Sequence, residues 1–476
     1  MITNKHIAVL ICFWVASINW GISQNTPVTI YSLDDCIKIA IKNNLELKIQ
    51  ELKANTSELG FNKSRASILP SLNMDYNLGM NSGRSIDPFT NNYINQELTF
   101  SSAGLNLNLT VFNGFKIKNE IKRSRFNMQA SEFEIEEAKQ NLILNVTLLY
   151  IQILNNTALV DLSESRLEIS KSQLDRVESL YKNGAGNPAD FTDMKGQYAK
   201  DQAGIIMAQN NLKIAKLNLF KILNIDLDFS NTFESINEFL SSTNYQLSAN
   251  EVYHDALQNL ATFKSKQLRI NAAEKGVKVA KSNYFPEVTF FGQLNTNYSS
   301  NAQVFTQTGT AIIETGDYIN IANQEHSVLR NDPVFKSDEI NYNDQLNNNL
   351  NSVAGVSVRI PLFNGFRAKN EVALEKIQVE TSIIELEQTK LNFKHSIEEA
   401  YKNMEAAYQQ YHILTNQVKA YEESFRVNEV RFNNGVSNIV EYITSKNNMD
   451  TSRLNLNKSK FEYLLRIKIL DYYRGI

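Results

Sequence analysis

Four short stretches of the chain alternate strictly between apolar and polar residues. In "SLNMDYNLGM" (71–80) and "GLNLNLTV" (104–111) every second residue is Leu, Met, Tyr or Val, and residues 288–295 and 356–362 repeat this period. A period of two over about eight to ten residues is typical of β-strands with one apolar face. A half-buried sheet in a soluble domain alternates identically, so the pattern alone leaves soluble and membrane strands open.

Two other stretches have a helical period and no Gly or Pro. They are residues 115–183 and 366–434, and each contains 69 residues, enough for a helix of about 100 Å. Their apolar residues advance by four and three in alternation, which predicts coiled-coil packing. The seams are Leu142, Val146, Leu149, Ile153, Val160, Leu167, Leu174, Val177 and Tyr181, and Ile397, Tyr401, Met404, Tyr408, Tyr411, Leu414, Val418, Tyr421 and Phe425. Return helices are expected at 188–223 and 439–473.

These patterns occur twice because the chain contains a tandem repeat. "VFNGFKIKNE" (111–120) returns as "LFNGFRAKNE" (362–371), with seven identical residues. "SLDDCIKIAIKNN" opens the first copy at Ser32 and "SANEVYHDALQNL" the second at Ser248, each with the spacing of a helix N-cap and its third-position acid. The offset grows from 216 to 251 residues between Pro286 and Phe363, so the second copy has one enlarged loop.

The repeat predicts the domain organisation. Residues 24–224 form the first copy, with a β-hairpin at about 70–112 and a helical hairpin at about 115–224. Residues 225–247 form a linker, and residues 248–476 form the second copy, with a β-hairpin at about 286–363 and a helical hairpin at about 366–474. The loops at 81–96 and 296–350 are rich in Asn, and we expect them to be polar and mobile.

The first 23 residues are interpreted as an export signal. A lysine precedes the apolar run "IAVLICFWVASI", and small residues stand at the -3 and -1 positions of a cleavage site before Gln24. A membrane anchor is the alternative, but twelve apolar residues are too short to span about 30 Å of hydrocarbon. No later stretch looks both long and apolar enough for a membrane helix. Once the signal is removed, Cys36 is the only cysteine, so no intramolecular disulfide can form.

Each long helix starts at a strand–helix junction, formed by Asn113, Gly114 and Phe115 in the first copy and by Asn364, Gly365 and Phe366 in the second. Glycine allows the positive φ that such a turn needs. The phenylalanines are placed where interfacial aromatic residues belong if the strands cross a membrane, and ordinary packing at a junction is the alternative.

Composition excludes several functions. The net charge of -3 gives no basic surface for nucleic acid, so no nucleic-acid partner is expected. The five histidines do not form a metal-ligand pattern with Cys36 or with a carboxylate cluster. Neither a phosphate-binding glycine loop nor a nucleophile elbow occurs. We therefore expect no enzyme activity, no cofactor, no metal, and no energy-coupling site of the chain's own.

Four strands cannot close a barrel, and open sheet edges are not viable in lipid. If the strands cross a membrane, several chains must therefore contribute to one barrel. Their Leu, Val and Met residues would then face lipid, and their polar residues would face a wet lumen. The lumen candidates are Asn73, Asp75, Asn106, Asn108 and Arg359.

The duplicated order of proline, β-hairpin, Asn-Gly-Phe turn, paired long helices and Asn-Gly tip resembles the outer-membrane efflux proteins of the TolC type. The resemblance covers almost the whole mature chain. It implies an α+β membrane protein that forms a homotrimer, with a 12-strand β-barrel in outer-membrane lipid and a 12-helix α-barrel in the periplasm. It also implies two partners, a periplasmic adaptor and an inner-membrane pump.

The resemblance also indicates a closable periplasmic tip. The family's aromatic residue before the tip glycine corresponds to Tyr181 before Gly184 and to Phe432 before Gly435. The acids after the glycines correspond to Asp190, Asp193 and Glu441, whereas Thr444 replaces the fourth acid and Gly186 and Ser437 stand where some members have a basic residue. The alternative role for the acids is helix capping, because Asn187 and Asn438 have N-cap spacing and a carboxylate at the third position stabilises its own helix.

Two functions remain open from the sequence. The favoured one is an outer-membrane exit duct that passively conducts substrates in a tripartite efflux or type I secretion system. The alternative is a periplasmic structural or adhesin-like coiled-coil protein without channel activity. The alternating strands beside very long helices favour the duct.

Overall fold

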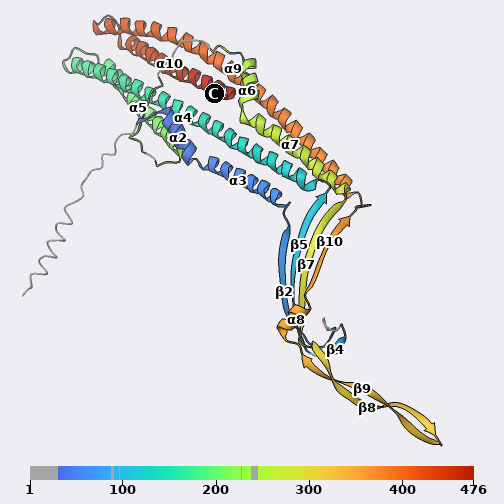
Figure 1. The fold of residues 1–476 in the computed structure, drawn as a ribbon. Coiled ribbons are helices and arrows are strands. Elements are labelled where there is room, and N and C mark those ends of the chain that lie inside the picture. Colours follow the sequence, from blue (N-terminus) through green and yellow to red (C-terminus); the bar gives the residue numbers. More distant parts are fainter. Residues whose placement is uncertain (1–29, 87–90, 96, 227, 237–244) are drawn as a thin grey trace, which may run out of the picture. The chain divides into compact units, whose positions relative to one another are not determined.

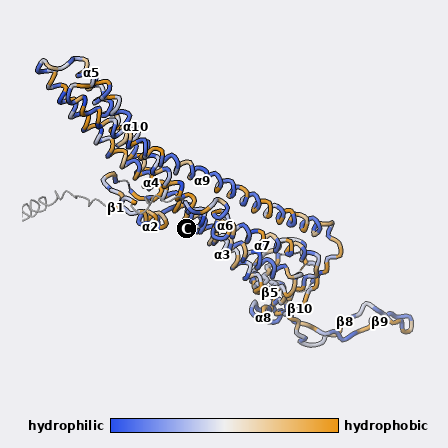
Figure 2. Tube along the Cα trace, turned by 90° about the horizontal axis from the view of Figure 1, so that it is seen from above, coloured by the Kyte–Doolittle hydropathy of each residue, from blue (hydrophilic) through white to orange (hydrophobic). Residues whose placement is uncertain are grey.

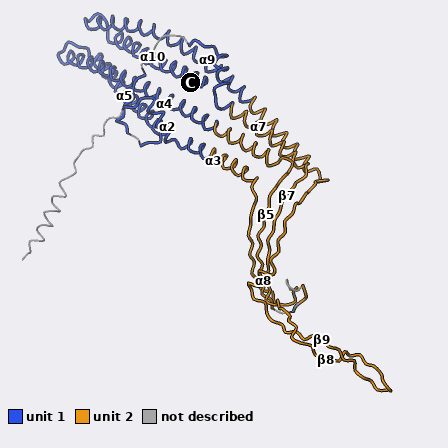
Figure 3. Tube along the Cα trace, viewed as in Figure 1, with its two compact units in different colours: residues 1–52, 133–263, 388–476 blue, residues 53–132, 264–387 orange. Residues whose placement is uncertain are grey.

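The computed structural model describes residues 30–86, 91–95, 97–226, 228–236 and 245–476, so the expected signal at 1–23 lies outside the described residues. The chain divides into two compact units (Figure 3). Of the described residues, those within 1–52, 133–263 and 388–476 form the helical unit, and those within 53–132 and 264–387 form the sheet unit. Each unit therefore draws residues from both copies of the repeat.

Both copies open with a short helix that has the same N-terminal cap. Helix α2 (Leu33–Asn43) is capped by Ser32 and Asp35, and α6 (Ala249–Asn259) by Ser248 and Glu251, each pair forming a reciprocal capping box. The N-cap prediction is confirmed. Each short helix is followed by a second one, α3 (Leu45–Ala66) and α7 (Ala261–Lys281), because the backbone at the intervening residue is extended.

The two long stretches without Gly or Pro are single helices. Helices α4 (Lys116–Lys182) and α9 (Arg367–Asn433) each contain 67 residues, and their return helices α5 (Pro188–Leu223) and α10 (Ile439–Arg474) each contain 36. In each copy the long helix and its return helix lie side by side as a hairpin (Figure 1). Hydrophobic and hydrophilic residues alternate along all four helices (Figure 2), as a 3.5-residue seam requires.

The main core of the helical unit lies between α2, α4 and α5. Leu142, Val146, Tyr150 and Ile153 of α4 are buried against Leu219 of α5 and its neighbours. Strand β1 (Ile30–Tyr31) pairs in parallel with β6 (Thr232–Phe233). The Tyr150 hydroxyl shares its proton between the carbonyl oxygens of Tyr31 in β1 and of Glu234 after β6, at 2.9 and 2.7 Å. Strand β6 thus gives the segment between the two copies a fixed point in the helical unit.

One expectation about hydropathy was wrong. Helix α4 contains an 18-residue window with a mean hydropathy of 1.4, which is long and apolar enough to cross a membrane by those two measures alone. Its apolar residues between Leu142 and Leu154 form part of the core just described. Packing against neighbouring helices accounts for part of this hydropathy, since 28% of the window is buried.

The sheet unit contains a four-stranded antiparallel sheet in the order β10-β7-β5-β2. Its strands are β2 (Ser71–Asn81), β5 (Leu98–Asn113), β7 (Glu287–Ser299) and β10 (Asn351–Arg359). The four strands predicted from alternation are confirmed. The last one ends at Arg359, three residues earlier than expected, because Pro361 has no N–H to continue a ladder.

The enlarged loop of the second copy is more regular than expected. Strands β8 (Gln303–Ile321) and β9 (Gln324–Glu339) pair into an antiparallel ribbon that projects beyond the sheet (Figure 1). Helix α8 (Tyr342–Asn348) closes the end of the sheet, where its buried Gln345 side chain exchanges hydrogen bonds of 3.0 Å with the backbone of Ser299. In the described part of the first copy's loop there are two short strands, β3 (Arg84–Ile86) and β4 (Tyr93–Asn95).

Candidate functional site

The strand–helix junctions have the same backbone in both copies. Gly114 and Phe115 have φ angles of 63° and 64°, and Gly365 and Phe366 have φ angles of 64° and 60°. The expectation for the glycines is met, but the left-handed backbone of each phenylalanine was not predicted. A non-glycine residue in this region costs on the order of 1–3 kcal/mol. At Gly114 a Cβ would also lie 2.7 Å from the Ser282 carbonyl oxygen, so glycine is required there twice over.

The left-handed turn aims each junction ring at the aromatic residue before it. The rings of Phe112 and Phe115 meet edge to face at 5.3 Å, and those of Phe363 and Phe366 at 5.6 Å. All three of Phe115, Phe363 and Phe366 are largely exposed. Aromatic rings at strand ends are typical of a membrane–water boundary.

The lumen candidates share one face of the sheet. Asn73 lies opposite Asn106, and the Asn106 amide donates a 2.9 Å hydrogen bond to Asp75. Asp75 and Asn106 line a shallow polar hollow of about 420 Å³. Arg359 lies opposite Glu287 at 3.9 Å, in a pair too exposed to contribute much stability. The other face of β2 exposes Leu72, Met74, Tyr76, Leu78 and Met80.

The two helical hairpins end in identical turns. Gly184 and Gly435 have φ angles of 74° and 73°. In each turn the glycine N–H bonds to the carbonyl three residues back and the next N–H to the carbonyl five residues back, at 2.9 to 3.0 Å. This is the glycine-terminated helix cap in which a left-handed residue satisfies the last carbonyls. The tip glycines are therefore explained by helix termination in both copies.

The tip acids occupy the first turns of the return helices. The Asn187 side chain accepts from the N–H of Ala189 at 3.0 Å, and that of Asn438 accepts from the N–H of Glu441 at 2.8 Å. Asp190 and Glu441 thus stand at the third helical position, where a carboxylate is favoured by the helix dipole. Glu441 also lies 4.0 Å from Arg431, whereas Asp193 is exposed.

The two tips pack against each other within the helical unit. Leu174, Val177 and Met194 of the first hairpin share a buried cluster with Phe425 and Tyr442 of the second. Tyr181 stacks on Phe191 at 5.3 Å and Phe432 on Tyr442 at 4.9 Å. Each tip aromatic residue therefore packs against the return helix of its own hairpin, and Tyr181 keeps 43% of its surface exposed.

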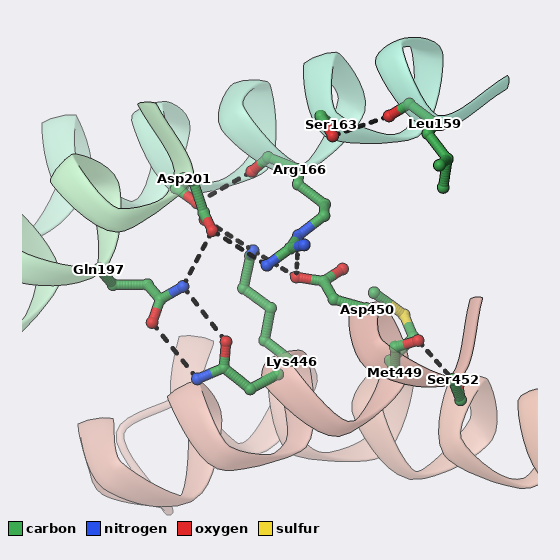
Figure 4. Close-up of polar contacts among 11 residues, drawn as sticks. Leu159, Ser163, Arg166, Gln197, Asp201, Lys446, Met449, Asp450 and Ser452 are labelled. Carbon is green, nitrogen blue, oxygen red and sulfur yellow. Dashed lines mark hydrogen bonds and ion pairs between the residues drawn. The ribbon is translucent and has the colours of Figure 1, made fainter. Parts of the chain in front are cut away.

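A buried network of polar residues lies farther from the tips, and nothing in the sequence analysis singled it out (Figure 4). Arg166 of α4 binds Asp201 of α5 at 3.2 Å and Asp450 of α10 at 3.1 Å. Lys446 of α10 binds the same two carboxylates at 3.1 and 2.8 Å. The side chains of Lys446 and Asp201 are fully buried, and that of Asp450 is 1% exposed. Gln197, next to Asp201, also exchanges hydrogen bonds with Asn447 across the two hairpins.

The network is neutral overall, since two cations face two anions. Burial raises the pKa of Asp201, but a hydrogen bond from Ser170 and the charge of Lys446 outweigh it, so this pKa lies below its usual value. The signal in the sequence was a charged residue at a seam position, because Asp201 follows the buried Met194 by seven residues and Lys446 follows Tyr442 by four. The seams were identified from their apolar residues alone, so the charged residues at seam positions were not recognised.

Comparison with known proteins decides the family. The model of the outer membrane efflux protein family matches residues 36–224 and 252–466, one stretch in each copy of the repeat. The chain belongs to this family. It is 21% identical over 443 residues to Toxin and drug export protein A of Aggregatibacter actinomycetemcomitans, covering 91% of this chain and 83% of that protein. It is 19% identical over 368 residues to the outer membrane efflux protein BepC of Brucella suis, covering 77% and 68%.

Solved structures of efflux channels share the fold. CusC matches with a TM-score of 0.75 at 16% identity, over 96% of this chain and 95% of that one. The Campylobacter jejuni outer membrane channel CmeC matches with a TM-score of 0.74 at 15% identity, over 93% and 85%. VceC of Vibrio cholerae matches with a TM-score of 0.73 at 13% identity, over 93% and 96%.

Membership of this family settles the choice between the two functions left open by the sequence. The protein is an outer-membrane efflux duct that extends into the periplasm, and the family works with an adaptor and an inner-membrane pump in tripartite systems. The resemblance noted from the Asn-Gly-Phe turns and paired hairpins is therefore confirmed, and so is the expected α+β class. The family and its structural neighbours are channels, not enzymes.

Proposed function

We propose that three copies of the chain assemble into one exit duct, with twelve strands closing a barrel in outer-membrane lipid. The observation that carries this proposal is the open sheet. Within the described residues, β2 and β10 each pair on one side only, while the residues of β2 on one face of the sheet are apolar and exposed. Unpaired strand edges are not tolerated in hydrocarbon, so β2 of one copy pairs with β10 of the next. The number three comes from the resemblance to TolC-type channels.

Cysteine cross-linking tests this pairing. Strand order makes β2 and β10 antiparallel across the new edge, so Asn73→Cys and Ser357→Cys, both on the polar face near the helix-proximal end, should form a disulfide between copies. Asn106→Cys with Ser357→Cys is the matched control, because β5 is already paired on both sides within its own chain. Cys36 will not interfere, since burial raises the pKa of its thiol to about 12.

Covalent trimers from the first pair and monomers from the control are the expected result on denaturing gels. A second pair places the β2 cysteine at Asp75 instead of Asn73. If neither pair gives cross-linked oligomers on the gel while the control pair does, the closed barrel is wrong.

At the other end, the hairpin tips form the gate of the duct in this proposal. Both hairpins have helices of 67 and 36 residues and identical glycine turns, so the tips end level and converge when copies assemble. Each copy then brings Asp190, Asp193 and Glu441 to the narrow end, beside Tyr181 and Phe432. Converging carboxylates attract cations and repel one another, an effect that weakens with salt. Capping and gating are compatible roles for the same acids.

The gate is tested by removing charge at constant shape. Asp190→Asn with Glu441→Gln should lower the cation preference measured by reversal potential in planar bilayers at low salt. Trimer yield should change little, because the lost helix-dipole interaction is worth only about 0.3–1 kcal/mol per site. Lys182→Gln is the control of opposite sign, since it removes a positive charge at the same tip and must not lower cation preference. Unchanged selectivity in the double variant would leave the acids as caps only.

Transport through this duct is passive in the proposal, with energy supplied by the inner-membrane pump. The alternatives for its cargo are small molecules of an efflux system or proteins of a type I secretion system. The relative named as a toxin and drug export protein is compatible with both. Reconstitution of export with each class of adaptor and pump would assign the cargo.

A further inference from the structure

The sheet unit contains an open cavity of about 990 Å³ at the first strand–helix junction. It lies between the end of α3, the end of β5 and the start of α4. Its walls are mainly apolar, formed by side chains that include Phe61, Leu69, Phe112, Phe115 and Ile121. Leu69 and Phe115 are 68% and 56% exposed, so the apolar wall is open to its surroundings.

A β-bulge places this cavity on the apolar face of the sheet. Leu109 pairs with Phe290 and Thr110 with Thr289, but Phe112 pairs with Val288, so Val111 is an extra residue in β5. Because Val288 and Phe290 are two residues apart on one strand, they share a face. Phe112 is thereby moved from the polar face to the face of Leu109. The cavity thus begins where the lipid-facing strand ends, at the level where hydrocarbon gives way to headgroups.

Four cations surround the apolar wall. Arg65 lies over the ring of Phe61 at 5.7 Å and Lys118 over that of Phe115 at 5.8 Å, and Lys122 and Arg125 also line the cavity. In the described part of the chain, none of the four is ion-paired with a carboxylate.

Lys122 also lies near Lys275 of α7. Burial, then the charge of Lys278 and then that of Lys122 lower the pKa of the Lys275 amine, against the opposing charge of Glu274. A site that is apolar inside and uniformly positive at its rim is complementary to an amphiphile with an anionic head.

We propose that this cavity binds an anionic phospholipid of the periplasmic leaflet. One acyl chain lies against Leu69, Phe112 and Ile121, and the phosphate is held by Lys118, Lys122 and Arg65. The proposal rests on the membrane orientation of the strands given above. A lipid is favoured over a soluble anion because the cavity wall is mainly apolar. One bound lipid in each copy would fix the depth of the duct in the membrane.

The second copy of the repeat provides a matched control. Lys369 lies over Phe366 at 5.9 Å, as Lys118 lies over Phe115, and Lys376 corresponds to Arg125. At the position of Lys122 the second copy has Ala373, so its junction carries fewer cations. Lys118→Gln with Lys122→Gln and Lys369→Gln with Lys376→Gln remove two exposed charges each, at equivalent ends of the two long helices.

Native mass spectrometry of the intact protein in mild detergent, titrated with phosphatidylglycerol, measures the binding. The affinity of Lys118→Gln with Lys122→Gln should fall by about thirtyfold at low salt, and that of the Lys369 and Lys376 control by less than threefold. The variant Lys118→Arg with Lys122→Arg, which keeps both charges, should retain the lipid. Millimolar inorganic phosphate should not displace it, because phosphate cannot fill the apolar wall.

Three results would overturn the proposal. They are equal loss of lipid in both glutamine variants, displacement by inorganic phosphate alone, and an intact wild-type oligomer that retains no phosphatidylglycerol. Bilayer conductance of the same samples separates this failure from failure of the duct. A conducting oligomer without lipid refutes the site and leaves the proposed function standing.

Discussion

The replacement of Lys446 by methionine tests the buried network that joins the two helical hairpins. The lysine is fully buried and lies 3.1 Å from Asp201 and 2.8 Å from Asp450. Methionine keeps most of the volume but leaves two buried carboxylates with Arg166 as the one remaining cation of the network. Removing one partner of a buried ion pair costs about 3–5 kcal/mol, because the remaining charge is uncompensated. We expect a loss of this size in the stability of the contact between the hairpins.

Hydrogen exchange of the intact assembly measures this loss locally. Amides of α10 around residue 446 should exchange about two to four orders of magnitude faster, since each 1.36 kcal/mol is a factor of ten. Lys402→Met is the control, because this exposed lysine of α9 bonds to Glu405 at 2.8 Å in a pair worth at most about 1 kcal/mol.

A second variant separates lost charge balance from lost packing. Lys446→Met with Asp450→Leu removes one cation and one anion and leaves Arg166 paired with Asp201. Replacing a buried ion pair by apolar residues of similar volume is often neutral or stabilising, so most of the protection should return. If Lys446→Met exchanges like the Lys402→Met control, or if the double variant is as unprotected as the single one, charge compensation is not what stabilises this contact.

Three further predictions concern the sheet, the ribbon and pH. Leu107→Arg should reduce the yield of heat-resistant oligomer on gels far more than Asn108→Arg. An arginine facing lipid at the midplane costs about 2–4 kcal/mol, whereas one facing the lumen stays hydrated. Equal yields would refute the assignment of the two faces. Deleting 303–339 should leave the oligomer intact, because the ends at 302 and 340 are already joined by a 3.2 Å backbone hydrogen bond; loss of oligomer would give the ribbon a structural role. Since the pKa of Asp201 is lowered in the folded protein, its contribution to stability is complete above about pH 4 and is lost as pH falls through the folded pKa. Protection of α10 should therefore fall on acidification in the wild type and change less in Asp201→Asn; parallel curves would show that another group titrates.

Local pattern was enough to predict most elements of this protein. Alternation predicted the strands because the side-chain period of a strand is two, so one apolar face is visible in the sequence. The absence of Gly and Pro predicted helices that the structure ends at Lys182 and Asn433, one residue before the predicted limits. The N-caps at Ser32 and Ser248 could also be predicted, since capping depends on residues only three positions apart.

What the sequence could not provide were contacts between residues far apart in the chain. Arg166, Asp201 and Lys446 are brought together by three helices. They were missed because a helix seam is recognised by its apolar residues and these three are charged. The ribbon at 303–339 was missed for a related reason. Its strands have two register irregularities and no strict alternation, so pairing across the hairpin, not period, defines them.

The lipid cavity shows the same division. The sequence determined that aromatic and basic residues follow the Asn-Gly-Phe turn in both copies. Strand pairing and helix packing, which the local pattern does not reveal, turn Phe112 to the apolar face through a bulge and bring Arg65, fifty-three residues before Lys118, to the same cavity. Periodicity reports the environment of each residue along its own element. The meeting of two elements depends on strand register and helix packing, which depend on many residues at once.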